Sequence, residues 1–440
     1  MSVPQVGAVR YPPLSTRENM LWNSAGSIIY LACQWFVTVL VVRLSSGYGA
    51  AGLLSLAMSV VGTFGTFANY KMGTYQVSDI KRENGTEEYL GFRLITLTGA
   101  FVACIAYALA TCPLDALLTI ALYFIFKGVG LVIDILHGVD QLNRRMDFIG
   151  KSFILQGLSM LVAFTAVFWL TESLNGAIVA MTVAVLGVLV LFDIPHARAF
   201  EPFGVRITAK KTAYLLRRSL SAVVAAVAGS AIFTVPKQYL LAVLGDASLG
   251  IYSSVAAPAL IVQMGATYLY VPLLDIFPRH YLEGRKDEFL KLLGRTVVGI
   301  IVVGAICFVA LGVVGEWALC LLFGDSIVPY AYLLQPVVVA SVATAFLWFF
   351  GDLLITIRCF RGNFIGNLVA FAAVLPLSVV CVNFWGMNGV SFAGAAACLF
   401  GAAVMAVFLA KRLGEMPEQG SEAEGAADGE TGKESDDGGK

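Results

Sequence analysis

The sequence predicts an all-α, polytopic membrane protein, and two observations carry this prediction. The 440-residue chain is 58% hydrophobic and only 13% charged, with a mean hydropathy of +0.82, whereas soluble domains have about 25% charged residues. Its apolar segments are continuous runs of about 20 residues, the length that a helix needs to cross the ~30 Å hydrocarbon core of a bilayer. These runs lack the alternation of a membrane β-strand, so helices are expected throughout.

About twelve transmembrane helices are expected. They fall at about 22–42, 52–71, 92–111, 115–136, 152–171, 176–194, 214–241, 249–277, 292–314, 331–357, 363–384 and 388–410. Lys and Arg beside transmembrane helices stay in the cytoplasm. They gather before the first span and after every second span, and Arg93 is assigned to one of these loops, whereas the other turns contain no Lys or Arg apart from Arg43. This alternation places both termini in the cytoplasm.

A repeat at an offset of 198 residues divides the chain into two halves. It pairs Gly47, Gly52, Ser55 and Thr98 with Gly245, Gly250, Ser253 and Thr296, and Lys81 and Arg93 with Arg279 and Lys291. The domains expected are an N-terminal six-helix lobe (1–195), a basic cytoplasmic connector (196–213) and a C-terminal six-helix lobe (214–413). An even number of spans separates equivalent positions, so the repeat is parallel and suits rocking of two lobes around a central cavity.

The end of the chain, 414–440, differs in composition from the rest. It contains nine of the 29 acidic residues and is rich in Gly, Glu, Ser and Ala. Such a segment cannot bury enough apolar surface to offset the entropy lost on ordering. A disordered, acidic cytoplasmic tail is expected.

Lys127 is the deepest charge in the membrane part of the chain. It lies near the middle of the fourth span, roughly 15–18 Å from either end of the helix, so its side chain should face a wet cavity or a carboxylate. The alternative is a structural ion pair, for example with Asp352 or Asp275. Arg43 and Lys237 lie toward the outer ends of the first helices of the two halves. They complete a cationic cavity if they face inward, and are ordinary interfacial residues otherwise.

Further polar side chains within the spans are candidates for binding. The candidate sugar contacts are Gln34, Trp35, Asn69, Tyr70, Gln156 and Gln263. Taken singly, such residues are more often interhelical hydrogen bonds or interface anchors. Asp134 and Asp352 lie deep enough to form a site for a coupling ion, H⁺ or Na⁺.

The opening of the chain carries a family resemblance. The run NMLWNSAGSIIYLACQWFVTVL has an Asn early in the first helix, and the stretch from Arg43 to Asp79 adds an Arg at the far end of that helix, a Gly-spaced turn and a TYQVSD exit. This opening resembles that of bacterial polysaccharide (lipid-linked oligosaccharide) flippases in the multidrug/oligosaccharidyl-lipid/polysaccharide exporter superfamily. The resemblance implies two lobes facing a V-shaped cavity with a basic lumen, and a substrate whose sugars are carried on an isoprenyl pyrophosphate.

The function expected is therefore translocation of a lipid-linked oligosaccharide across the bacterial plasma membrane, by alternating access, for surface polysaccharide biosynthesis. Three alternatives stay open. A cation-coupled drug antiporter of the same superfamily would favour a carboxylate in the cavity, a peptidoglycan-precursor flippase usually has additional helices, and an integral-membrane enzyme of polysaccharide assembly would need a catalytic site. The expected partners are the substrate, membrane lipids and other polysaccharide assembly proteins, with no nucleic acid.

Signatures of an enzyme, a cofactor or a metal site are missing from the sequence. It has no phosphate-cradling Gly-Lys-Ser/Thr loop, no HExxH and no DxD pair at an outer turn, so neither catalysis nor a cofactor is expected. The eight cysteines lie within or beside apolar runs and resemble buried hydrophobic residues. His137, His196 and His280 are assigned to separate basic loops, which disfavours a metal site. Residues 1–19 lack the apolar core of a signal peptide, so the first span is expected to insert the chain.

Overall fold

The computed structural model describes residues 11–70, 72–73, 76, 84–201, 203–274 and 276–414, and all regular secondary structure within them is helical. The elements are α1 (Thr16–Leu44), α2 (Gly49–Asn69), α4 (Thr86–Thr111), α5 (Ala116–Leu142), α6 (Met146–Thr171), α7 (Leu174–Val188), the π-helix η1 (Leu189–Asp193), α8 (Ile194–Phe200), α9 (Ala209–Ala231), α10 (Thr234–Ala256), η2 (Ala257–Ala259), α11 (Leu260–Tyr270), η3 (Val271–Leu273), α12 (Phe277–Leu282), α13 (Lys286–Phe323), η4 (Asp325–Leu333), α14 (Leu334–Thr356), α15 (Phe360–Trp385) and α16 (Asn388–Gly414). The all-α prediction is confirmed. The TYQVSD exit apart from Gln76, Asp275, and 415–440 of the predicted tail lie outside the described residues.

Eleven helices in this part of the chain are long and apolar enough to cross a membrane. One of them, Val223–Leu273, counts 51 residues, which as a straight helix would be about 77 Å long against ~30 Å for the hydrocarbon core. Gly245 breaks this segment inside α10 with φ 82° and ψ 175°, a conformation that glycine adopts without a steric penalty. A segment of this length with a break in it supplies two crossings, which agrees with the twelve expected.

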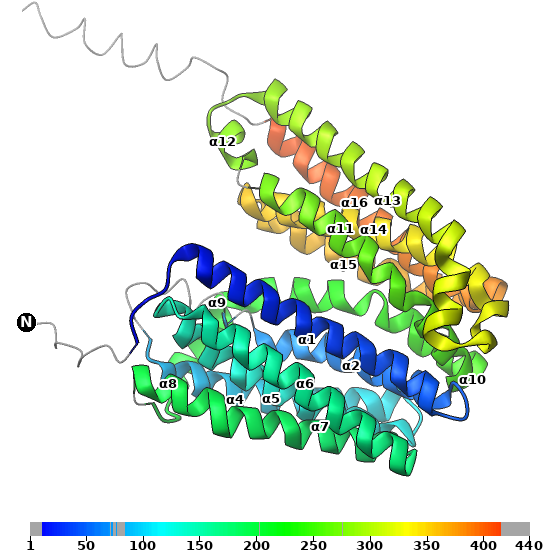
Figure 1. The fold of residues 1–440 in the computed structure, drawn as a ribbon. Helices are drawn as coiled ribbons and strands as arrows, with labels where there is room; N and C mark the ends of the chain where they lie inside the picture. The colour runs from blue at the N-terminus through cyan, green and yellow to red at the C-terminus, as the bar shows by residue number, and fades with distance from the viewer. Residues whose placement is uncertain are drawn as a thin grey trace, which may run out of the picture.

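The helices lie in two groups (Figure 1). One group contains α1, α2 and α4 to α8, the other contains α11 to α16, and α10 packs against both α2 and α15. Each group has a hydrophobic core of its own, and the first core also takes in Phe323 at the end of α13 and Leu334 at the start of α14. Because α9 contacts α2 as well as α15, the lobe boundaries at 195 and 214 stay a prediction.

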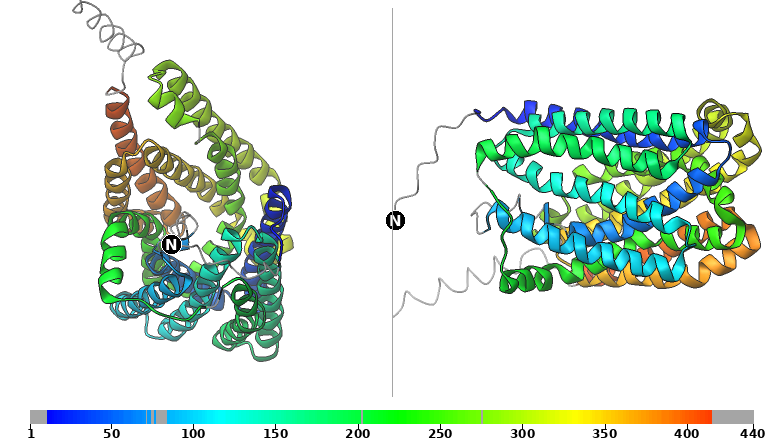
Figure 2. Two further views of the ribbon diagram at one scale, coloured as in Figure 1. Left: turned by 90° about the vertical axis from the view of Figure 1, so that its left-hand side faces the viewer. Right: turned by 90° about the horizontal axis from the view of Figure 1, so that it is seen from below.

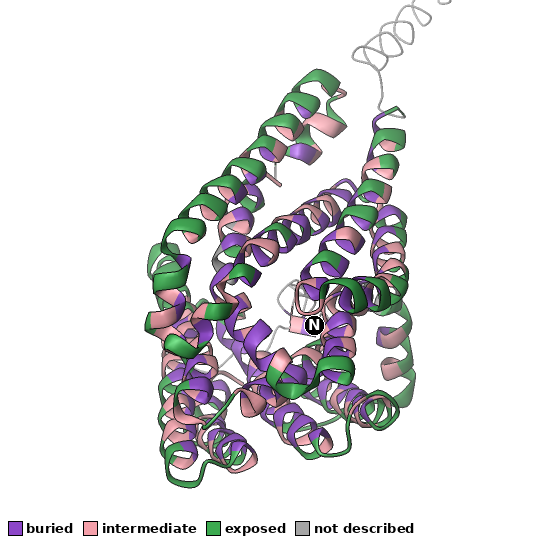
Figure 3. Cartoon of the chain, turned by 90° about the vertical axis from the view of Figure 1, so that its right-hand side faces the viewer, coloured by how far each residue is buried: buried purple, intermediate pink, exposed green. Residues whose placement is uncertain are grey.

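The outer surface of both groups is apolar. Exposed residues cover the outward faces of the helices, whereas buried residues face the interior of each group (Figure 3). On α13, the side chains of Ile306, Val309 and Val313 are 62%, 64% and 79% exposed. A continuous apolar surface of this kind suits contact with lipid rather than with water.

The start of α1 and the end of α16 lie at the same end of the molecule (Figure 2), and the two groups meet at the opposite end. There, residues related by the 198-residue repeat touch each other. The contacts pair Ser55 with Ser253, whose hydroxyl oxygens are 2.5 Å apart, Gly52 with the carbonyl of Asp246, and Gly250 with the carbonyl of Tyr48. Tyr48 and Asp246 are themselves 198 residues apart, so the contacts are reciprocal, as a two-fold axis between the halves requires. A Cβ on either glycine would lie only 2.0 or 2.1 Å from the facing oxygen.

Candidate functional site

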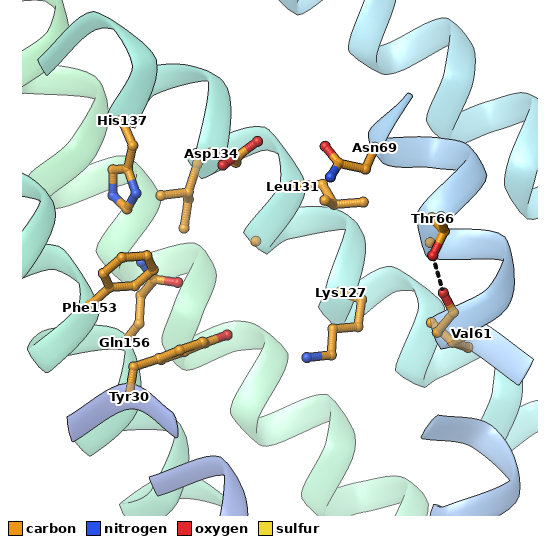
Figure 4. Close-up of a pocket in the computed structure, with 14 residues that line it drawn as sticks. Tyr30, Val61, Thr66, Asn69, Lys127, Leu131, Asp134, His137, Phe153 and Gln156 are labelled. Atoms are coloured by element: carbon orange, nitrogen blue, oxygen red, sulfur yellow. Dashed lines mark hydrogen bonds between the residues drawn. The ribbon is translucent and has the colours of Figure 1, made fainter. Parts of the chain in front are cut away.

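A cavity of about 400 Å³ lies inside the first group, between α1, α2, α5 and α6. Its polar lining includes Tyr30, Asn69, Lys127, Asp134, His137 and Gln156, whose side chains surround one space in Figure 4. The structure thus brings together four of the residues proposed from the sequence. We call this space the Lys127 cavity.

Lys127 has no carboxylate partner among the described residues. Its ammonium nitrogen lies 5.8 Å from the ring centroid of Tyr123 and 5.7 Å from that of Phe126. Among the described residues no ion pair joins Lys127 to Asp352, whose carboxylate accepts a 3.0 Å hydrogen bond from the Tyr270 hydroxyl. A lysine in an apolar helix whose charge is met only by aromatic faces and a cavity can bind an anion.

Arg93 supplies the second charge beside this cavity, and its assignment to a cytoplasmic loop is wrong. It lies in α4 and is 0% exposed. Its guanidinium donates to the carbonyl of Ala68 and to Asn69 Oδ1, both at 3.0 Å, and to Asp134 Oδ2 at 3.1 Å. Asp134 therefore enters the cavity wall already paired with a cation. The sequence contains a pattern that indicates this position. Arg93 shares one helix face with Tyr89, Thr96 and Ala100, and the structure buries all four residues.

The assignment of His137 to a loop is also wrong. It lies in α5, only 6% exposed, and its ring packs edge-on against Phe153 at a centroid distance of 5.0 Å. Tyr30 was not recognised at all. Its hydroxyl accepts a 2.8 Å hydrogen bond from Gln34 Nε2, so Gln34 acts on the cavity through Tyr30. On the far wall, Gln156 is 2% exposed and donates to Ser152 Oγ at 2.9 Å.

Two of the other candidate sugar contacts of the first half lie outside this cavity lining. The ring of Trp35 packs against Phe36 at a centroid distance of 5.2 Å. Tyr70 ends α2 with a left-handed backbone, φ 49°, and its buried hydroxyl donates to the carbonyl of Leu216 at 2.8 Å. Tyr70 thereby ties α2 to α9.

A second cavity, of about 270 Å³, lies around Lys237, between α9, α10, α11, α14 and α16. Gln263 and Tyr252 line it together with Lys237, and so do Thr344 and Trp348. As in the first cavity, the lysine has no carboxylate partner among the residues that the structure describes. The lining of this second cavity contains no acidic residue and no histidine. We call it the Lys237 cavity.

Arg43 belongs to neither cavity lining. Its guanidinium donates to the carbonyl of Leu322 at 2.8 Å and also reaches the carbonyls of Cys320 and Leu321. These carbonyls belong to the last turn of α13, where a positive charge is favourable. The structure therefore places Arg43 as a tie between α1 and α13, at the end where the two groups of helices meet.

Known proteins share this architecture. No protein-family model matches the chain. The capsular polysaccharide biosynthesis protein CapF of Staphylococcus aureus is 23% identical over 319 residues, covering 70% of this chain and 78% of that protein. An inward-facing multidrug resistance MATE family transporter of the MOP superfamily has a TM-score of 0.67 at 14% identity, covering 88% and 98% of the two chains. The lipid II flippase MurJ, in an inward closed conformation, has a TM-score of 0.67 at 10% identity, covering 90% and 89%.

Proposed function

We propose that this chain, which has the membrane-transporter fold of the MOP superfamily, is a flippase that moves a lipid-linked oligosaccharide across the bacterial plasma membrane for surface polysaccharide biosynthesis. The resemblance stated from the sequence is confirmed at the level of the fold. The relative from Staphylococcus aureus is named for capsular polysaccharide biosynthesis, which supports a glycan as cargo. In this proposal both termini face the cytoplasm and the two halves alternate in access.

The observation that carries the proposal is the unpaired Lys127 in a cavity lined by amides, hydroxyls and aromatic rings. A phosphate forms charge-assisted hydrogen bonds with an ammonium group, and these bonds are strong where water is scarce. Tyr30, Asn69 and Gln156 offer the groups that bind sugar hydroxyls. A pyrophosphate joined to sugars matches both parts of the lining.

A cation-coupled drug antiporter fits this lining less well. A drug cation would need a free carboxylate in the cavity, and the carboxylate that lines it, Asp134, is bound to Arg93. The deepest charge is a lysine, which repels a cation. The proposal therefore favours an anionic substrate.

The test is export of surface polysaccharide by cells whose own copy of the gene is replaced by Lys127→Ala. The alanine variant should lose export at normal protein abundance, because the head group loses its charge partner. Lys127→Arg should retain part of the activity, since it keeps the charge. Lys291→Ala is the control, because Lys291 is exposed on α13, and it should export normally.

Unchanged polymer export by Lys127→Ala would remove the residue from the mechanism. Purified protein in proteoliposomes separates the remaining alternatives. Movement of a fluorescent isoprenyl-pyrophosphate oligosaccharide between leaflets supports the flippase, whereas transfer of sugar from one lipid to another would identify an enzyme.

A further inference from the structure

Three titratable side chains lie buried together behind the Lys127 cavity. His137 and Asp140 are one turn apart on α5, and Asp193 is the last residue of η1. His137 Nε2 lies 3.4 Å from Asp193 Oδ1, with side-chain exposures of 7% and 2%, and Asp140 is 3% exposed. We call these three residues the His137 cluster.

Each member of the cluster has a buried polar atom without a hydrogen-bond partner. These atoms are Nε2 of His137, Oδ1 of Asp140 and Oδ2 of Asp193. A buried polar atom left unpaired is costly, so three of them in one place need an explanation. Protons bound within the cluster supply one, because each added proton converts an acceptor into a donor and gives a neighbouring oxygen a partner.

The cations nearby are already committed to another acid. On the α6 side, Arg145 donates to both oxygens of Asp147 at 2.8 and 3.0 Å, and Lys151 donates to the same carboxylate at 2.9 Å. On α8, His196 Nδ1 lies 2.7 Å from the carbonyl of Phe192. Among the described residues, Asp193 therefore has the His137 imidazole as its ion-pair partner, and Asp140 forms no ion pair.

The backbone of η1 positions Asp193 for this contact. The N–H of Ile194 donates to the carbonyl of Leu189, five residues back, as in a π-helix. One such turn contains an extra residue. The residues that follow it are therefore rotated by about 100° around the helix axis relative to a continuous α-helix. Single π-turns inside α-helices are frequent at functional sites, and this one directs an acid toward α5.

His137 connects the cluster to the cavity. It lines the Lys127 cavity, as do Lys127 and Asp134 on the same helix (Figure 4), while its Nε2 faces Asp193. A charge gained by His137 is therefore felt in the cavity. No group of three or more His, Cys, Asp or Glu in the described part of the chain has the arrangement of a metal site.

We propose that His137, Asp140 and Asp193 form a proton-binding site that controls the charge of the Lys127 cavity. A proton from water binds the Nε2 lone pair of neutral His137 and is shared with the carboxylate of Asp193, which adds one positive charge to the cavity wall. An anion bound near Lys127 then stabilises the proton, and the proton stabilises the anion to the same extent. The role of this proton as the coupling ion rests on the proposed function, whereas its binding does not.

Proton binding can be measured directly, since the chain has only three histidines. The full-length protein in lipid nanodiscs, carrying ¹⁵N-labelled histidine, is titrated by NMR, and His137→Gln identifies the His137 signal. In Asp193→Asn this signal should titrate at a pH lower by at least one unit, about a tenfold weaker binding of the proton, because an amide does not stabilise an imidazolium. Asp140→Asn should act in the same direction.

The control is a second histidine–carboxylate pair, found in the part of the chain that the structure describes. His280 Nδ1 lies 3.1 Å from Glu288 Oε2, but the Glu288 side chain is 49% exposed. Exposed pairs contribute up to about 1 kcal/mol, so Glu288→Gln should move the His280 signal by less than about 0.7 pH unit. A His137 signal that does not change with pH, or that is the same in folded Asp193→Asn and Asp140→Asn, would overturn the site.

Coupling is measured separately, by export from vesicles with an imposed pH gradient. The wild-type rate should respond to the gradient and the His137→Gln rate should not. An equal response of both would leave a proton site that does not drive transport and would refute the coupling. If Lys127→Ala also exports normally, the proposed function fails while the NMR result stands.

Discussion

The two halves of the chain share one framework but differ in their charges. At equivalent positions of the repeat, Arg93 is fully buried and bound to Asp134 beside the Lys127 cavity, whereas Lys291 is exposed on α13. Both cavities contain an unpaired lysine, a tyrosine and a glutamine, yet acids and histidine line the first cavity only. The repeat thus preserves the helix contacts, whereas the acidic and histidine side chains that could bind ions line only the first of the two cavities.

The largest effect is expected at Arg93. Arg93→Ala removes the buried guanidinium that donates to Asp134 and Asn69. Breaking such a pair costs about 3 kcal/mol, at the lower end for buried pairs because the Asp134 side chain is 47% exposed. Lys291→Ala, at the equivalent position, should stay within about 0.5 kcal/mol of the wild type. Equilibrium unfolding in detergent measures the free energy of unfolding of both variants. Equal decreases for Arg93→Ala and Lys291→Ala would contradict the difference between the two halves.

The next effect separates the two cavities. Lys127→Ala should lower the rate of lipid-linked oligosaccharide translocation in proteoliposomes by about 10- to 100-fold, the value of a charge-assisted hydrogen bond of about 1.5–3 kcal/mol. Lys237→Ala should lower it by less than tenfold, since the lining of its cavity contains no acidic residue and no histidine beside the lysine. The reverse order would move the substrate site to the second half.

A third prediction concerns the place where the halves are alike. Gly52→Ala and Gly250→Ala each put a methyl group against a backbone oxygen, and overpacking of this kind costs about 1–3 kcal/mol. Because the contacts are reciprocal, the free energies of unfolding of the two variants should fall by the same amount, to within about 0.5 kcal/mol. Thermal unfolding of both variants in detergent measures this. Very unequal losses of stability would show that the two symmetry-related contacts do not contribute equally to the stability of the protein.

The smallest effect is expected at Arg43, where the repeat is broken. Its counterpart 198 residues later is Leu241, which cannot donate to a helix end. Arg43→Ala should cost about 1 kcal/mol, as for an exposed charge at a helix terminus. Arg43→Lys should recover only part of this, because an ammonium lacks the planar fork that reaches three carbonyls. Identical melting temperatures for wild type and Arg43→Ala would show that the tie is energetically neutral.

The fold was predictable from the sequence because spanning helices need long apolar runs, and the chain contains little else. Lys127 could be identified for a related reason. A charged side chain in the middle of an apolar helix cannot reach the membrane surface and must face a cavity or a partner of opposite charge. Arg93 and His137 were harder to assign, because both lie near helix ends, where a cytoplasmic loop residue and an inward-facing residue have the same local sequence. The partners of Arg43 lie 277–279 residues away in the chain, and helix spacing says nothing about contacts at that separation.

The length of α13 has a consequence for the membrane around the protein. From Thr296 to Phe323 this helix has 28 residues with one charge, Glu316, which corresponds to about 42 Å against a hydrocarbon core of ~30 Å. Its outward apolar side chains can stay in lipid only if the helix tilts or the adjacent bilayer thickens. Either adjustment has an elastic cost that depends on acyl-chain length, so the thickness of the host membrane becomes one of the variables that set the equilibrium between conformations.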